Sequence, residues 1–180
     1  MKIQQEGCIL GVDPGSRITG FGLIQYSGRQ FQYLASGCIE LKNYGWPERL
    51  KIIHDGISLL LEKYNPNMAA IERIFVYKNP QTAIKLGQAR GAALAAIAAK
   101  NLNLAEYAPR QIKQALVGFG GASKEQIQHS IKALLKLSKL PPSDAADALA
   151  IAICHLNRTV TVQPGSNCSP VGAGLRVSPI

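Results

Sequence analysis

Four acidic residues lie in or beside the most apolar segments of this chain, and they are the side chains best suited to chemistry. They are Asp13, Glu72, Asp144 and Asp147, out of 11 acidic residues in the whole sequence. A carboxylate in an apolar environment is costly unless it is paired or bound to a metal ion. Glu72 precedes Arg73, but the other three have no Lys or Arg as an immediate neighbour. All four are therefore candidate metal ligands.

Two of these acids are close in sequence. Asp144 and Asp147 are three positions apart among small residues, so a helix would present both on one face of its first turns. Acidic residues also suit a helix N-terminus electrostatically, and Ser143 or Asp144 is an ordinary N-cap candidate. For this pair alone, capping and catalysis both stay open.

The complete set favours metal-dependent chemistry. Mg²⁺ prefers oxygen ligands and usually takes few carboxylates, which leaves positions for water and phosphate oxygens. Three or four convergent acids fit two ions, which together can promote in-line cleavage of a phosphodiester bond. The histidines His54, His129 and His155 are scattered, so the sequence offers no competing Ser-His-Asp or Cys-His site, and each is interpreted as a surface or hydrogen-bonded helix residue.

Strands and one helix in the first half would carry two of the acids. The apolar run from Cys8 to Val12 stops at Asp13-Pro14-Gly15, which predicts a buried strand with Asp13 at its end. Residues 19–26 and 31–41 are rich in strand formers and predict an antiparallel meander with the first strand. Helical spacing follows from Pro47 to Leu61, and the apolar run 68–74 predicts a strand that carries Glu72.

The second half is mainly helical. It contains an Ala-rich segment at 83–100, a short strand at 104–107, and three further helices at 110–117, 124–137 and 143–156. The predicted order is β-β-β-α-β-α-β-α-α-α. From Thr159 onward Pro, Gly and Ser increase and periodicity is lost. We expect one domain at 1–157 and a flexible C-terminal tail at 158–180.

The composition of the chain indicates which class of binding partner to expect. A chain of 180 residues with 47% hydrophobic residues can close one ordinary core. A net charge of +9 favours a polyanion, with nucleic acid ahead of a membrane surface. No secretory or membrane-spanning segment is recognisable, so we expect a cytoplasmic protein without a membrane partner. The cysteines lack zinc-site spacing and are expected to be reduced and mostly buried; they are Cys8, Cys38, Cys154 and Cys168.

Four motifs in order resemble the bacterial RuvC family of Holliday junction resolvases, and the resemblance runs from about Cys8 to His155. The motifs are the residues Gly11 to Gly22 around Asp13, Ala70 to Phe75 around Glu72, Lys85 to Gly91, and Asp144 to Ala150. The resemblance implies an α/β, RNase H-like fold with a mixed five-stranded sheet flanked by helices. It also implies an endodeoxyribonuclease that nicks two opposing strands of a four-way DNA junction, in homologous recombination and DNA repair.

The same resemblance assigns roles to individual residues. It implies that Asp13, Glu72, Asp144 and Asp147 are catalytic and bind two Mg²⁺ ions per subunit, with Mn²⁺ as a substitute. Some relatives carry His at the last of these positions, where this chain has Asp147. The match also implies DNA contacts by Phe75, Lys113 and Lys124. From the residues alone, Phe75 would be a core side chain and the two lysines would be solvated helix residues.

Partners follow from the resemblance as well. It implies a homodimer and cooperation with the branch-migration proteins RuvA and RuvB. Two cuts related by a two-fold axis need two identical sites, which a symmetric dimer supplies. Gly87, Gly91 and the run 92–99 give one helix a smooth face that suits either a partner helix or the internal core.

Two other functional classes stay open. The strand-Asp-x-Gly-Ser pattern also occurs in actin-like ATPases and sugar kinases, although those need a second lobe with its own phosphate loop. A structure-specific DNA-binding module without catalysis is the other alternative, and the intact acid set argues against it.

Overall fold

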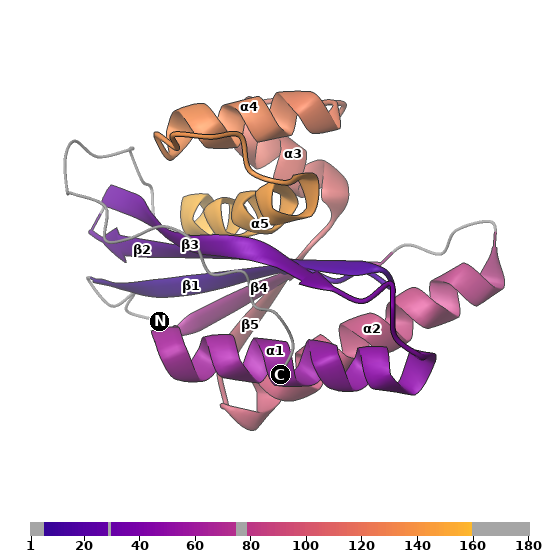
Figure 1. Ribbon diagram of the computed structural model, residues 1–180. Coiled ribbons are helices and arrows are strands. Elements are labelled where there is room, and N and C mark those ends of the chain that lie inside the picture. The colour runs from indigo at the N-terminus through magenta and orange to yellow at the C-terminus, as the bar shows by residue number, and fades with distance from the viewer. Residues whose placement is uncertain (1–5, 29, 75–78, 160–180) are drawn as a thin grey trace.

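One mixed sheet forms the centre of the molecule in the computed structural model, which describes residues 6–28, 30–74 and 79–159 (Figure 1). Within these residues the sheet has five strands in the order β3-β2-β1-β4-β5. The strands are β1 (Glu6–Asp13), β2 (Ile18–Ser27), β3 (Gln30–Glu40), β4 (Met68–Glu72) and β5 (Asn103–Tyr107). The element order is the one that the sequence predicts.

The sheet combines two kinds of pairing. β1, β2 and β3 form an antiparallel meander, as predicted, whereas β4 is parallel to both β1 and β5. Parallel neighbours need long crossover connections, which the intervening helices supply. The carboxyl ends of β1 and β4 therefore lie at the same edge of the sheet.

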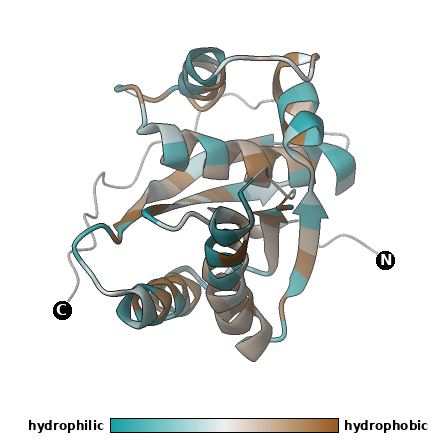
Figure 2. Cartoon of the chain, turned by 90° about the vertical axis from the view of Figure 1, so that its right-hand side faces the viewer, coloured by the Kyte–Doolittle hydropathy of each residue, from teal (hydrophilic) through white to brown (hydrophobic). Residues whose placement is uncertain are grey.

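Helices cover both faces of the sheet (Figure 1). α1 (Trp46–Tyr64) and α2 (Pro80–Ala99) cover one face. α3 (Pro109–Val117), α4 (Lys124–Leu134) and α5 (Ser143–Thr159) cover the other, with α5 directly on the sheet. Figure 2 colours α1 in neighbouring hydrophobic and hydrophilic segments, as expected for a helix with one face on a core.

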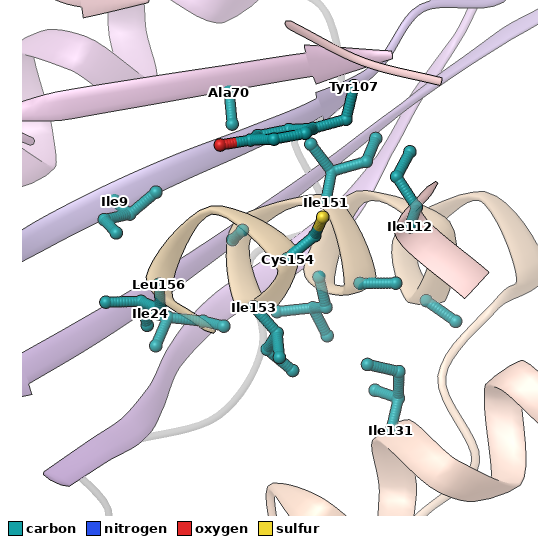
Figure 3. Close-up of a cluster of buried hydrophobic side chains, with 14 of the residues drawn as sticks. Ile9, Ile24, Ala70, Tyr107, Ile112, Ile131, Ile151, Ile153, Cys154 and Leu156 are labelled. Carbon is teal, nitrogen blue, oxygen red and sulfur yellow. The ribbon is translucent and has the colours of Figure 1, made fainter. Parts of the chain in front are cut away.

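Strand alternation divides the core into two clusters. On β1, Ile9 packs toward α5, whereas Leu10 and Val12 pack toward α1 and α2. Figure 3 shows the α5 side, where the Tyr107 ring and Ile9 lie over the helix and Ile131 approaches from α4. α5 is buried along most of its length from Ala145 to Leu156, so its place against the sheet is fixed by packing.

Several element ends differ from the prediction. α4 ends at Leu134 and not at 137, because Lys136 adopts a left-handed backbone (φ 51°) that a helix cannot continue through. β4 stops at Glu72 and not at Ile74. α5 continues to Thr159, past the predicted domain boundary at 157, and the remainder of the predicted tail lies outside the described residues.

The structure also bears on the cysteines and on the character of the helices. Cys8 and Cys154 are buried free thiols and Cys38 is a partly buried one, while Cys168 lies outside the described residues. Among the helices that the structure describes, none combines the length and the apolar character needed to cross a lipid bilayer.

Candidate active site

Asp13 and Glu72 lie at the ends of neighbouring parallel strands. Val12 on β1 is paired with Ile71 on β4, and each acid is the next residue along its strand. Because side chains alternate between faces, both acids follow Gly11 and Ala70 onto the α5 face of the sheet. The structure thus places the first two predicted site residues side by side, facing the helix that carries the other two.

Glycines let α5 approach this edge of the sheet closely. Gly20 on β2 is paired with Asp13, and a Cβ atom at Gly20 would lie 2.0 Å from the backbone oxygen of Asp144. A Cβ atom at Gly11 would lie 2.1 Å from the backbone oxygen of Ala148. Any side chain at these positions would push the helix away. The start of α5 therefore lies directly against the strands beside Asp13.

The charges of the other three acids act on Asp13. Burial raises the pKa of Asp13 well above its ordinary value, and the negative charges of Glu72, Asp147 and Asp144 raise it further. Mutual repulsion of this kind requires proximity, because charges in a partly buried site interact strongly only over short distances. Residues from three separate parts of the sequence thus form one acidic site.

Glu72 and Asp147 are shifted in the same direction. Burial, with the charge of Asp147, raises the pKa of Glu72 to about 7. The pKa of Asp147 is raised by burial and by Asp144. Lys124 and Lys113 oppose both shifts, so these two cations lie within electrostatic range of the same acids. A group with a perturbed pKa in such a cluster is typical of a functional site.

The two lysines flank the site from α3 and α4. The Lys124 ammonium lies 3.9 Å from an Asp147 carboxylate oxygen, and its side chain is 66% exposed. It is the first residue of α4, where the helix dipole disfavours a cation, so its position there is unfavourable for the helix alone. Lys113 donates a hydrogen bond to the carbonyl oxygen of Ala122 (2.6 Å). Both lysines therefore lie beside the carboxylates. The third predicted DNA contact, Phe75, lies outside the described residues.

The donor set suits a hard divalent cation. All four candidates are carboxylates, and Mg²⁺ binds through one or two carboxylates while it keeps several waters. As the side chains stand in the described residues, no group of three or more Asp, Glu, His or Cys residues is placed so that it could hold a metal ion. Four like charges repel one another, and a divalent cation between them would offset that repulsion.

The structure also identifies supporting residues that the sequence did not indicate. Arg49 on α1 donates hydrogen bonds to the carbonyl oxygens of Ser16 (2.9 Å) and Tyr44 (2.8 Å), which fixes the turn after Asp13. The Thr19 hydroxyl is buried and bonds both the N–H and the carbonyl oxygen of Gly15 in that turn. No local pattern could reveal the Arg49 contacts, because Ser16 lies 33 residues away in the chain.

The histidines take the structural places expected of them. His155 is buried, and its Nδ1 atom forms a 2.8 Å hydrogen bond with the Tyr107 hydroxyl. His54 on α1 is partly exposed and its Nδ1 atom lies 3.2 Å from an Asp55 carboxylate oxygen, and His129 is exposed on α4. The interpretation of all three as surface or hydrogen-bonded helix residues agrees with these positions.

Known proteins are similar to this chain in sequence. The family model described as crossover junction endodeoxyribonuclease RuvC matches residues 9–155. The RuvC of Francisella tularensis subsp. holarctica is 55% identical over 163 residues, which cover 91% of this chain and 95% of that protein. The RuvC of Francisella philomiragia is 56% identical over 147 residues, which cover 82% of this chain and 86% of that one.

A solved structure agrees at the level of the fold. Thermus thermophilus RuvC, determined in complex with a Holliday junction substrate, superimposes with a TM-score of 0.79 at 32% identity. The match covers 86% of this chain and 96% of that one. The prediction of an RNase H-like fold with a mixed five-stranded sheet is thereby confirmed. On its sequence and on its fold, this chain belongs to the RuvC family of crossover junction endodeoxyribonucleases.

Proposed function

We propose that this protein resolves four-way DNA junctions at the site formed by Asp13, Glu72, Asp144 and Asp147. As a member of the family, it is an endodeoxyribonuclease that hydrolyses phosphodiester bonds. The observation that carries the proposal is the meeting of two strand ends with the first turns of α5. A purely structural helix cap at Asp144 would not explain why Asp13 and Glu72 face the same place.

The four carboxylates would hold two Mg²⁺ ions per subunit, and Mn²⁺ would substitute. Such a pair of ions supplies an activated water and steadies the leaving 3′ oxygen of the DNA. Asp13 and Glu72 are fixed by the sheet and the two aspartates by α5, so the ligands are held by rigid elements.

The neighbouring cations would bind the DNA backbone. Lys124 and Lys113 lie beside the acids, where an ammonium group can contact a phosphate and offset charge that develops during cleavage. Phe75, three residues after Glu72, would contact unpaired bases at the junction by stacking.

A homodimer would provide the second cut, with α2 as the contact helix. One face of α2 packs into the core through Ala89, Ala93, Ala96 and Ile97. The opposite face is exposed: Ile84 is 61% exposed, and Cβ atoms at Gly87 and Gly91 would meet nothing within 4 Å. The core interpretation holds for the buried face, and the exposed face would be smooth enough to receive a second copy.

RuvA and RuvB would deliver the junction in the cytoplasm, with no membrane partner. Residues 1–157 would form the nuclease domain and 158–180 a flexible tail.

A synthetic mobile four-way junction tests the proposal. The protein should introduce paired, symmetric nicks in two opposing strands with Mg²⁺ and none without it, which mapping of all four strands would reveal. Asp13→Asn should bind the junction and fail to cut it. Unchanged cutting by Asp13→Asn, or tight ATP binding without cutting, would contradict the proposal.

A further inference from the structure

Arg90 on α2 contacts the main chain of a candidate metal ligand. Its Nε atom donates a hydrogen bond to the backbone carbonyl oxygen of Glu72 at 3.2 Å. Its Nη2 atom lies 2.8 Å from a carboxylate oxygen of Glu106 on β5. The Arg90 side chain is only 18% exposed. This guanidinium is therefore committed to two protein oxygens and is poorly placed to bind a DNA phosphate.

The contact falls where β4 ends. Glu72 is the last residue of the strand, and the backbone N–H of Arg73 donates to the carbonyl oxygen of Tyr107 at 2.8 Å. Arg90 adds a second contact from the α2 face of the sheet, which is the face opposite α5. Glu106 lies on that face because it is paired with Ile71, whose side chain packs toward α2. The peptide that carries the Glu72 side chain is thus held by β5 and by α2 together.

The backbone that carries Arg90 is rigid. Ala89 and Ala93 are fully buried on the neighbouring face of α2, so the helix backbone at Arg90 cannot shift freely. Glu106 orients the guanidinium, and its carboxylate also lies 3.7 Å from Arg73. A planar guanidinium can donate in two fixed directions at once, which an ammonium group does less well.

We propose that Arg90 is a positioning residue for Glu72. By fixing the last peptide of β4, it holds the Glu72 carboxylate toward α5 and so sets the affinity of the site for divalent cations. The inference rests on the proposed function, because it takes Glu72 to be a metal ligand. Groups that orient a metal ligand typically change metal affinity by about 10- to 100-fold when they are removed.

The test compares four variants of the full chain. Arg90→Gln removes both the positive charge and the planar guanidinium that contacts Glu72 and Glu106 together. Arg90→Lys keeps the charge but cannot make both contacts in the same geometry. Lys100→Gln is the matched control, because it removes one charge from the end of the same helix, where Lys100 pairs with Glu62 at 3.7 Å. Glu72→Gln removes the proposed ligand itself.

Three quantities are measured for each variant. They are Mn²⁺ binding to the DNA-free protein by calorimetry, junction binding without divalent ions, and the Mn²⁺ dependence of cleavage. Arg90→Gln should raise the half-saturating Mn²⁺ concentration about tenfold in both metal titrations, with Arg90→Lys in between and Lys100→Gln within about twofold of the parent. Cleavage by Arg90→Gln should recover at saturating Mn²⁺. A variant damaged only in folding would instead keep the half-saturating Mn²⁺ concentration of the parent and show a lower maximal cleavage rate, because less of the protein is active.

The failures are distinguishable. If Glu72→Gln abolishes cleavage while Arg90→Gln binds Mn²⁺ like Lys100→Gln, the positioning role of Arg90 is wrong and the proposed function stands. If Glu72→Gln cuts as fast as the parent protein, Glu72 is not a ligand and both proposals fall.

Discussion

Gly20→Ala should separate the position of α5 from the general stability of the fold. The added Cβ atom would lie 2.0 Å from the backbone oxygen of Asp144 and 2.5 Å from its carbonyl carbon. Contacts of real Cβ atoms essentially never fall below 3.0 Å, so the helix start must retreat by about 1 Å. The backbone of Asp144 cannot rotate away as a flexible side chain would, so the displacement moves Asp144 and Asp147 together.

The expected loss of activity exceeds the loss of stability. A misplacement of about 1 Å at a catalytic group can lower the rate on the order of 100-fold. Overpacking typically costs about 1 to 3 kcal/mol, and alanine restricts the unfolded chain enough to offset roughly 0.5 to 1 kcal/mol of that. Gly20→Ala should therefore remain folded at room temperature and cleave far more slowly than the parent.

The assay pairs cleavage rates at saturating metal with thermal melting and with junction binding. Gly45→Ala is the control, because a Cβ atom there meets nothing within 4 Å. It should cleave at the parent rate. If Gly20→Ala melts earlier yet cleaves within about threefold of the parent, the position of Asp144 does not control catalysis and the reasoning is refuted.

Three further predictions follow from the electrostatics of the site. First, because burial raises the pKa of Glu72 from 4.5 to about 7, the metal-free fold should lose stability as pH rises from about 4.5 to 7. At pH 8, Glu72→Gln should therefore raise the free energy of unfolding by on the order of 3 kcal/mol at most and melt at a higher temperature than the parent, and an earlier melting would contradict this. Second, the carboxylates must lose their protons to bind a cation, so Mn²⁺ affinity measured by calorimetry should rise as pH increases through about 7. A pH-independent affinity would exclude Glu72 as a ligand. Third, Lys124→Gln should shift the pH dependence of Mn²⁺ affinity to higher pH, because Lys124 lowers the pKa of Asp147 and Glu72. The same variant should reduce the salt dependence of junction binding by about one counterion. Lys132→Gln, at the other end of α4, is the control and should leave the pH dependence of Mn²⁺ affinity unchanged.

Local patterns in the sequence predicted most of the fold. Alternation and helical spacing predicted, in the right order, the ten elements found in the described part of the chain, because each pattern is encoded within a few neighbouring residues. The errors lie at element ends. The apolar residues after Leu134 continue the helical spacing, but the left-handed Lys136 stops the helix, and a backbone conformation of that kind leaves no trace in hydrophobic periodicity.

The candidate acids could also be found, but their arrangement could not. Asp13 stands out because a Pro-Gly turn follows an apolar run, and Asp144 and Asp147 because of their spacing. The parallel pairing of β1 with β4, which aligns Asp13 with Glu72, depends on the tertiary fold. The same holds for the glycines beneath α5 and for the Arg90 contacts, whose partners lie 16 residues or more away in sequence.

Whether Asp13, Glu72 and the first turns of α5 share divalent cations is tested most directly by anomalous diffraction from crystals of the protein soaked in Mn²⁺. The expected result is Mn²⁺ density bounded by carboxylate oxygens of Asp13 and Glu72 on the sheet and of Asp144 or Asp147 on the helix. Mn²⁺ density elsewhere on the molecule, with these four carboxylates free of metal in a cleavage-competent protein, would contradict the site.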